Sequence, residues 1–272
     1  MTETEATFIG TATVLLRLGR FTVLTDPNFL HKGQRAYLGH GLWTRRRTEP
    51  ALDVDELPAL DGIVLSHLHG DHFDRVARHG LPQDVPIATT RPAARRLRRW
   101  QFDRAVGLPD WGDVVWYRGN EALRVTAVPA RHGPTGVHLA MPATMGSVLD
   151  WERDGERRLR LYISGDTRYN PRVLRDIPER FGDIDAALLH LGGTRILGVL
   201  VTMNARDGLA LSRLVRPRRI VPIHYDDYTV FRESLPPFLR LAAASEFADA
   251  VQPVLRGQTI DLLEPAVSGA RP

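Results

Sequence analysis

The sequence of 272 residues predicts a mixed α/β domain. Three observations carry this prediction. Short β-rich runs bounded by Gly, Pro and Asp recur along the whole chain, and stretches with helical spacing stand between them. Strands in both halves end at a polar residue of the kind that binds metals. No linker-like stretch divides the chain, so a single domain over residues 1–264 with a flexible tail at 265–272 is the simplest account.

The N-terminal part predicts a β-hairpin, a turn and a long loop. The expected hairpin joins the runs 7–18 and 21–25 through Gly19-Arg20, and Asp26-Pro27-Asn28 then favours a turn. Residues 29–58 have few periodic apolar runs and many Gly, Arg and Pro residues. Long ordered loops are usually lids or rims of a site. Tyr37 and Trp43 in this loop either line a pocket or attach the loop to the core.

After this loop, strands and helices alternate. Proline near the first helical position and Asn204 as a cap mark helix starts, and the continuous apolar run 184–191 indicates a strand buried on both faces. The expected elements are strands at 63–65, 87–90, 123–128, 158–164, 184–191 and 219–223, a hairpin tip at 150–157, helices at 73–79, from Pro92 to Trp100, at 204–215 and from Pro236, and a last hairpin at 254–263.

Composition excludes several classes of protein. The chain is 43% hydrophobic and 25% charged and contains no cysteine, so disulfides, thiolate metal sites and cysteine nucleophiles are excluded. No apolar run reaches the ~18 residues that cross a bilayer. The first residues lack the pattern of a secretory signal, so we expect a cytoplasmic location.

The charge pattern bears on the partners. The formal net charge is +4 and the pI is near 9.8, because Lys32 is the only lysine among many arginines. Arginine binds phosphate and carboxylate through two hydrogen bonds, so a small anionic substrate is compatible with the sequence. Nucleic-acid binding requires basic residues on one face, and here they are scattered except at 45–47 and 91–99, so nucleic acid is the less favoured partner. The sequence leaves open whether the protein forms a homo-oligomer.

The run Ser66–Asp74 indicates a metal site. It holds three imidazoles and two carboxylates directly after an apolar run. These nitrogen and oxygen ligands suit zinc, manganese or iron(II). Residues two apart do not share a helix face, but a sharp loop after a strand can direct His67 and His69 to one ion and Asp71 and His72 to a second. The alternative is a solvated polar turn with a helix-capping aspartate.

Four predicted strands end in residues of this ligand type. The four residues are His67, His132, Asp166 and His224. Loops at one edge of a sheet are where α/β folds assemble sites from distant segments. A lone histidine is more often a hydrogen-bonding residue than a ligand, so the prediction of convergence depends on the first run.

With these residues in view, the sequence resembles the metallo-β-lactamase superfamily. The resemblance rests on Ser-His-Leu-His-Gly-Asp-His, then His132, Gly-Asp-Thr at Asp166 and Pro-Ile-His-Tyr at His224, and it covers nearly the whole chain. It is most similar to the branch of L-ascorbate-6-phosphate lactonase and N-acyl-phosphatidylethanolamine-hydrolysing phospholipase D. The resemblance implies a four-layer αββα sandwich of two mixed sheets flanked by helices.

The resemblance also implies two divalent metal ions, for which Zn²⁺ is favoured and Mn²⁺ or Fe²⁺ are alternatives. It assigns the ligands as follows: His67, His69 and His132 to one ion, Asp71, His72 and His224 to the other, and Asp166 as the bridge. Two such ions can hold a hydroxide between them and polarise a carbonyl or phosphoryl group. We expect Asp71 to ligate and also to steer the proton as this hydroxide attacks.

For residues around the expected ligands, the sequence leaves more than one role open. Asp26 either orients a ligand histidine or caps a turn, and His190 is either a catalytic or substrate-contacting residue or a buried histidine. Thr11 and His190 depart from the branch, which often has histidine and proline there. Candidate substrate contacts, chosen only because they neighbour the motifs, are Arg131, Arg195, Tyr225 and Asp227.

The sequence therefore predicts a metal-dependent hydrolase that cleaves a small ester, lactone or phosphodiester. A metal-dependent nuclease is the first alternative, motivated by the arginines, and its binding would weaken steeply with salt. A non-catalytic metal-binding protein is the second, and it would hold metal without turning over any such substrate.

Overall fold

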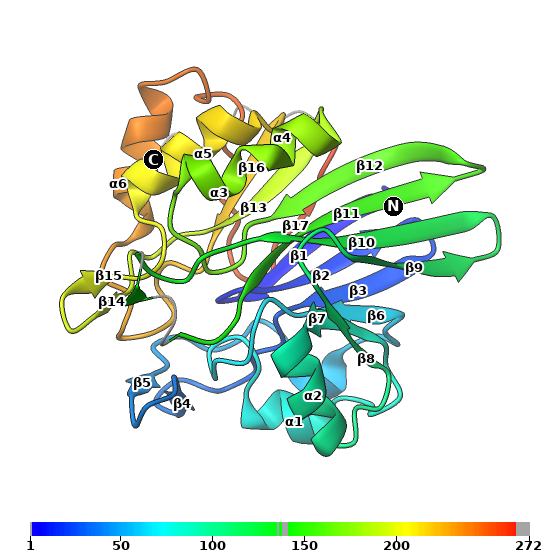
Figure 1. Cartoon of the computed structure of the whole chain (residues 1–272), viewed down its shortest axis with the longest axis horizontal. Coiled ribbons are helices and arrows are strands. Elements are labelled where there is room, and N and C mark those ends of the chain that lie inside the picture. The colour runs from blue at the N-terminus through cyan, green and yellow to red at the C-terminus, as the bar shows by residue number, and fades with distance from the viewer. Residues whose placement is uncertain (1, 135, 138–140, 265–272) are drawn as a thin grey trace.

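The fold consists of two β-sheets packed face to face with helices on both outer faces (Figure 1). The structure is a computed structural model that describes residues 2–134, 136–137 and 141–264. The predicted mixed α/β class, with two mixed sheets between helices, is confirmed. The predicted tail at 265–272 lies outside the described residues.

The first sheet has seven strands and is built mainly from the N-terminal third. Its strands, in spatial order, are β17 (Thr259–Asp261), β1 (Thr4–Gly10), β2 (Thr13–Leu18), β3 (Phe21–Thr25), β6 (Gly62–Val64), β7 (Ile87–Thr90) and β8 (Ala105–Leu108). The pairs from β17 to β3 are antiparallel, and those from β3 to β8 are parallel. Parallel strands need crossover connections, and here α1 and α2 supply two of them.

The second sheet has six strands. In spatial order they are β16 (Arg219–Ile223), β13 (Ala186–His190), β12 (Glu156–Ile163), β11 (Met145–Arg153), β10 (Glu121–Pro129) and β9 (Asp113–Arg118). The strands β12, β13 and β16 are parallel, while β9 to β12 form an antiparallel meander. Because β10 and β12 each pair antiparallel with β11, the strands β10, β12, β13 and β16 all run in the same direction.

The helices cover the outer faces, as Figure 1 shows. Below the first sheet lie α1 (Arg75–Gly80) and α2 (Arg91–Arg99), and above the second lie α3 (Pro171–Leu174), α4 (Asp176–Phe181), α5 (Ala205–Val215) and α6 (Leu235–Ala243). The remaining elements are the short hairpins β4 (Arg35–Tyr37) with β5 (Trp43–Arg45) and β14 (Arg195–Ile196) with β15 (Val199–Leu200), and the 3₁₀ turn η1 (Val54–Glu56). Among the described residues, no helix is both long and apolar enough to cross a membrane.

The main core lies between the two sheets. Phe21 and Val23 of the first sheet and Leu149 and Trp151 of the second are buried in one apolar cluster. Burying each such side chain contributes roughly 1.5–3 kcal/mol, so this interface holds the two sheets at a fixed distance. Two further clusters attach the helices to the outer faces.

Several predicted elements are right in kind, and two are wrong in extent or in pairing. The expected hairpin tip at 150–157 is present but its extent is wrong, because β11 and β12 extend into it and the turn is only Asp154-Gly155. Its polar residues face each other across the strands, where the guanidinium of Arg160 contacts the carboxylate of Asp150 at 2.6 Å. The expected last hairpin at 254–263 is also wrong, since only β17 forms there and it pairs with β1.

The topology brings the predicted site residues to one edge. The strands β3 and β6 are parallel, and each is followed at its C-terminal end by residues of the metal-ligand type. In the second sheet the same holds for β10, β12, β13 and β16, which run together. Loops at the C-terminal ends of parallel strands are the usual place for a site, and here the loops of both sheets meet.

Candidate metal centre

Seven His and Asp side chains lie together at this edge. They are His67, His69, Asp71 and His72 after β6, His132 after β10, Asp166 after β12 and His224 after β16. Each is at most 6% exposed. The structure therefore brings together all seven residues that the sequence predicted as ligands.

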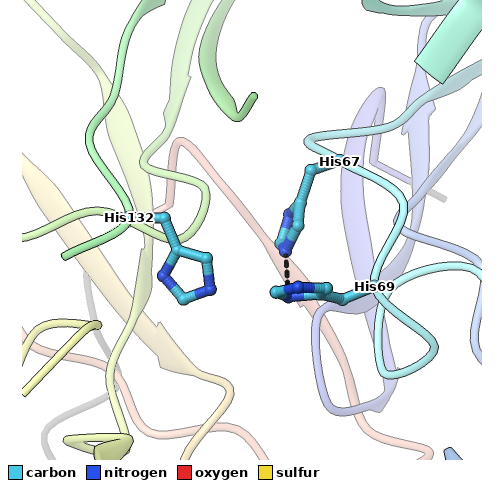
Figure 2. Close-up of side chains that lie close together, drawn as sticks. All are labelled: His67, His69 and His132. Carbon is cyan, nitrogen blue, oxygen red and sulfur yellow. Dashed lines mark hydrogen bonds between the residues drawn. The ribbon is translucent and has the colours of Figure 1, made fainter. Parts of the chain in front are cut away.

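Three histidines form the first group. His67, His69 and His132 offer nitrogen atoms that all lie within 4.8 Å of one another. In Figure 2, the ring of His132 faces the other two from a different chain segment, and the dashed line joins His67 to His69. The nitrogens Nε2 of His67 and Nδ1 of His69 are 3.0 Å apart. Three imidazoles that converge in this way form the ligand set of many zinc sites.

The second group is made of Asp71, His72 and His224, whose ligand atoms also lie within 4.8 Å of one another. Oδ2 of Asp71 is 3.6 Å from Nε2 of His224. Asp166 stands between the groups, because its Oδ2 is 3.3 Å from Nε2 of His72 and 3.7 Å from Nε2 of His132. A single carboxylate thus reaches both groups.

Four buried atoms of this cluster have no hydrogen-bond partner among the described residues. They are Oδ1 of Asp71, Nε2 of His72, Oδ1 of Asp166 and Nε2 of His224. A buried polar atom without a partner costs about 1–3 kcal/mol, so four in one place need a ligand. Imidazole nitrogens and carboxylate oxygens suit a divalent cation such as zinc, manganese or iron(II). The residues present therefore fit the metal that the sequence predicted.

In His132 and His224, the ring nitrogen that points away from the cluster has a hydrogen-bond partner in the protein. Nδ1 of His132 donates to the carbonyl oxygen of Val201 at 3.0 Å, and Nδ1 of His224 lies 3.3 Å from the carbonyl oxygen of Leu191. A carbonyl oxygen can only accept, so these bonds place the proton on Nδ1 and leave the Nε2 lone pair directed at the cluster. Metal-binding histidines are usually oriented in this way.

Asp26 supports the loop of ligands from behind. It follows β3 and is 1% exposed. Its Oδ1 accepts from the backbone N–H of Ser66 at 2.7 Å, and its Oδ2 accepts from the Ser66 hydroxyl at 2.9 Å and lies 3.0 Å from Nδ1 of His72. The Ser66 hydroxyl is in turn 3.0 Å from Nδ1 of His67. Asp26 thus contacts one histidine directly and a second through Ser66.

His190 lies behind the same carboxylate. It is fully buried at the end of β13, with Nδ1 3.2 Å from the Ser164 hydroxyl and Nε2 3.4 Å from Oδ2 of Asp26. Its ring stacks on that of His72, with centroids 5.9 Å apart. Of the two roles that the sequence left open, this position favours the buried histidine that holds Asp26.

The two groups differ in the direction in which the pKa values of His67, His69 and His72 are shifted. Burial lowers the pKa of His67 well below its ordinary value and that of His69 to about 3, so both rings are neutral near pH 7. Burial also acts to lower the pKa of His72, but the carboxylates of Asp166, Asp71 and Asp26 outweigh it and raise that pKa. Neutral imidazole is the metal-binding form, and a cation between these carboxylates would take the place of the proton on His72.

The backbone is bent where it presents these groups. Asp26 has φ +35° and His224 has φ +61°, in the left-handed region that residues other than glycine rarely adopt. Gly165, at φ +59°, precedes Asp166, and a Cβ there would lie 2.4 Å from the carbonyl oxygen of Met145. Only glycine allows this approach, which sets the position of Asp166.

The four candidate substrate contacts are spread out. Arg131 and Arg195 are exposed, on the loop before His132 and on the β14–β15 hairpin, and Tyr225 is half-buried. Asp227 is fully buried, and its carboxylate accepts from the backbone of Thr11 at 2.8 Å and the hydroxyl of Thr48 and contacts Arg256. These bonds tie three loops together, so the surroundings of Asp227 favour a structural role.

A pocket lies beside the cluster, and the sequence indicated only part of its lining. A cavity of about 580 Å³ reaches His69 and is lined by the β4–β5 hairpin, α1 and the end of α2. Tyr37 and Trp43 of the long loop line it, which was one of the two roles considered for them. Four arginines from three elements also line it. Their positions in the sequence gave no sign that they meet.

Comparison with known proteins gives a consistent picture. Residues 22–225 match the family model described as the beta-lactamase superfamily domain. The N-acyl-phosphatidylethanolamine-hydrolyzing phospholipase D 1 of Caenorhabditis elegans is 27% identical over 235 residues, which cover 82% of this chain and 64% of that protein. A metal-dependent hydrolase of Thermus thermophilus is 28% identical over 231 residues, 84% of this chain and 87% of its own.

The fold also matches solved structures. The crystal structure of a possible metal-dependent hydrolase from Veillonella parvula superposes with a TM-score of 0.79 at 21% identity, over 96% of this chain and all of that chain. At this identity the likeness shows the shared fold of two sheets between helices.

Proposed function

Because this chain belongs to the beta-lactamase superfamily, we propose that it is a metal-dependent hydrolase that cleaves a small ester, lactone or phosphodiester. The observation that carries the proposal is the cluster of seven buried ligand-type side chains with four unpartnered atoms facing inward. The relative in Thermus thermophilus is named a metal-dependent hydrolase, and that in Caenorhabditis elegans a phospholipase D, which supports the hydrolysis of a phosphodiester or a related bond.

Two divalent ions, with zinc favoured, would be held by the two groups. His67, His69 and His132 would hold one, Asp71, His72 and His224 the other, and Asp166 would contact both. When bound, such ions lower the pKa of a coordinated water toward ~7 and polarise the bond to be cleaved, so a nucleophile is present at neutral pH.

The chain's own residues would orient and move protons. Asp71 has one oxygen near His224 and another without a partner, so Oδ1 can hold a proton during the reaction. Asp26 and His190 would act through His72, because both lie behind it and neither faces the cluster with an unpartnered atom.

The test combines metal analysis with a hydrolysis screen. We expect the purified protein to bind close to two equivalents of zinc or manganese and to hydrolyse at least one substrate in a panel of aryl esters, lactones and phosphodiesters. His67→Ala and Asp166→Asn should each lower kcat by about 10² or more, since each removes a ligand needed for the nucleophile. His79→Ala, an exposed histidine on α1, is the control and should change neither metal content nor rate.

Two results would sink the proposal. One is purified protein that takes up no metal at micromolar concentrations while keeping its native circular dichroism. The other is turnover that survives in both ligand variants, because hydrolysis would then come from elsewhere or from a contaminant. Metal uptake with no turnover on any substrate would instead favour a metal-binding protein without catalytic activity.

A further inference from the structure

The pocket beside His69 is positively charged. Its lining includes Arg35 of β4, Arg75 and Arg78 of α1 and Arg96 of α2. Within the described part of the chain, none of these four guanidinium groups is paired with a carboxylate. The acid in the lining, Asp74, is buried and accepts from the backbone N–H groups of Phe29, Leu30 and Ala77. The pocket thus gathers cations that have no carboxylate partner among the described residues.

Two of these arginines are held in place by an aromatic ring. The guanidinium carbons of Arg78 and Arg96 lie 4.4 and 5.1 Å from the ring centroid of Trp100. Trp100 stacks on Phe73, with centroids 6.3 Å apart, and Phe73 is 5% exposed. Such contacts restrict the arginine side chains while their N–H groups stay available. Less entropy is then lost when they bind an anion.

Another part of the lining is aromatic and open to solvent. Tyr37 is 46% exposed and Trp43 is 60% exposed, and their ring centroids lie 4.9 Å apart. Exposed aromatic side chains that line a cavity are typical of surfaces that bind the apolar part of a ligand. The volume of about 580 Å³ is that of a small-molecule site.

The segment that carries Tyr37 is hydrogen-bonded to the loop of candidate metal ligands. The backbone N–H of Gly70, between the candidate ligands His69 and Asp71, donates to the carbonyl oxygen of Tyr37 at 2.8 Å. A Cβ at Gly70 would lie 2.7 Å from the backbone nitrogen of Tyr37, so only glycine permits this contact. The pocket therefore keeps a fixed distance from the cluster.

We propose that this pocket binds an oxyanion, phosphate or carboxylate, through Arg78 and Arg96, and packs the ligand's apolar part on Tyr37 and Trp43. That this ligand is the substrate rests on the proposed hydrolysis. The substrate class is then an anionic ester, lactone or phosphodiester with an aromatic or aliphatic body. Arginine suits both oxyanions because its planar donors form two parallel hydrogen bonds to either.

Binding is tested on protein stripped of metal, so that metal ions cannot bind the anion. Phenyl phosphate and phenylacetate are titrated separately by calorimetry, which shows which oxyanion the pocket prefers. We expect Arg78→Met with Arg96→Met to raise the Kd of the preferred ligand about tenfold or more. The double lysine variant should recover part of this loss. Arg95→Met is the control, since Arg95 is exposed on α2, the helix of Arg96, and does not line the pocket.

Activity of the metal-loaded enzyme gives the second readout. Mono-4-nitrophenyl glutarate and 4-nitrophenyl valerate present the same ester with and without a terminal carboxylate. The double methionine variant should raise KM for the charged ester with kcat unchanged, and it should leave the neutral ester unaffected.

The two proposals fail separately. Equal Kd values in wild type and the double methionine variant overturn the pocket proposal even if the enzyme hydrolyses esters. Binding that depends on the arginines supports it even if no ester, lactone or phosphodiester is turned over, in which case the hydrolase proposal fails alone. The pocket proposal is also overturned if Arg95→Met loses as much affinity for the small anion as the double methionine variant does. It is likewise overturned if a short oligonucleotide binds more tightly than the small anion in a way that depends on Arg95, which would indicate a nucleic-acid surface.

Discussion

Asp26 contacts the candidate ligand histidine His72 directly and His67 through Ser66. Burial acts to raise the pKa of Asp26, but His72 and His190 outweigh this and lower the pKa to about 2. The carboxylate is therefore charged at any ordinary pH, and it accepts hydrogen bonds from the backbone and hydroxyl of Ser66. Its left-handed backbone conformation, at φ +35°, directs the side chain under the ligand loop.

Asp26→Asn should weaken metal binding about 10–100-fold, as is common when the partner of a ligand histidine is changed. The amide keeps the size of the side chain but replaces one acceptor oxygen by a donor. Ser66 and His72 then compete for the remaining oxygen. Zinc affinity is measured by competition with a chromophoric chelator.

Asp61→Asn is the matched control for Asp26→Asn. Asp61 directly precedes β6, at the end of this strand away from the cluster, where it accepts from the backbone of Thr22 and pairs with Arg118 of β9. Its variant should bind zinc as the wild type does. Unchanged zinc affinity in Asp26→Asn would show that Asp26 only caps the turn after β3.

Some single residues could be identified from the sequence, and others could not. The run from Ser66 to Asp74 places four candidate ligand residues in one loop, so its chemistry is visible without a structure. His190 and Asp227 resemble site residues in sequence because they neighbour motifs, but their surroundings come from segments far away. Asp227 contacts Thr11 and Thr48, more than 170 positions earlier, and no local pattern reports this.

The antiparallel hairpins of the second sheet depend on charged side chains at their ends. Glu121 starts β10 and is 2% exposed. Its carboxylate accepts from the backbone N–H of Arg20 at 2.8 Å, Nε1 of Trp151 at 3.0 Å and Nε of Arg153 at 3.0 Å. One side chain thus joins the β2–β3 turn of the first sheet to β10 and β11 of the second.

Glu121→Gln should destabilise the fold by about 1–2 kcal/mol at neutral pH, because three donors lose a charged acceptor. Burial acts to raise the pKa of Glu121, but these donors outweigh it and hold the pKa below its ordinary value of 4.5. A carboxylate with a lowered folded-state pKa stabilises the fold above the unfolded-state value, and this contribution is lost as the pH falls through the folded-state pKa.

The difference in unfolding free energy between wild type and Glu121→Gln should therefore be full at pH 7 and shrink below about pH 4.5. Urea unfolding over this range measures it. Glu152→Gln, a half-buried change in the same hairpin, should stay within about 0.5 kcal/mol of wild type. A difference for Glu121→Gln that is constant with pH would mean that its charge contributes nothing.

Elements with strong local signals were predictable, and those that depend on distant pairing were not. Asn204 caps α5 through a hydrogen bond from the N–H of Asp207, as its position predicted. The strands β8 and β9 were missed, and both lie at sheet edges, where one side of each strand has no partner strand. The polar residues of β11 are stabilised by cross-strand partners, so a pattern based on apolar runs assigned them to a turn.

The candidate metal centre joins the two sheets. His67, His69, Asp71 and His72 belong to the first sheet, and His132, Asp166 and His224 belong to the second. Each of the two groups of ligands contains residues from both sheets. A metal ion at either group would therefore crosslink the two layers at this edge, in addition to hydrogen bonds such as the one between His190 and Asp26.

Metal should accordingly stabilise the whole fold. A ligand that binds only the folded state at a hundred times its Kd adds about 2.7 kcal/mol, which corresponds to a rise in Tm of roughly 5 °C for a chain of this size. We expect zinc to produce such a rise in calorimetry of chelator-stripped protein, and excess chelator to reverse it. His67→Ala from one sheet and His132→Ala from the other should reduce the rise to a similar extent, because each removes a ligand from the same group. The exposed control His79→Ala should keep it in full. A rise that depends on His67 but not on His132 would show that the ion is held by the loop after β6 alone and does not join the sheets.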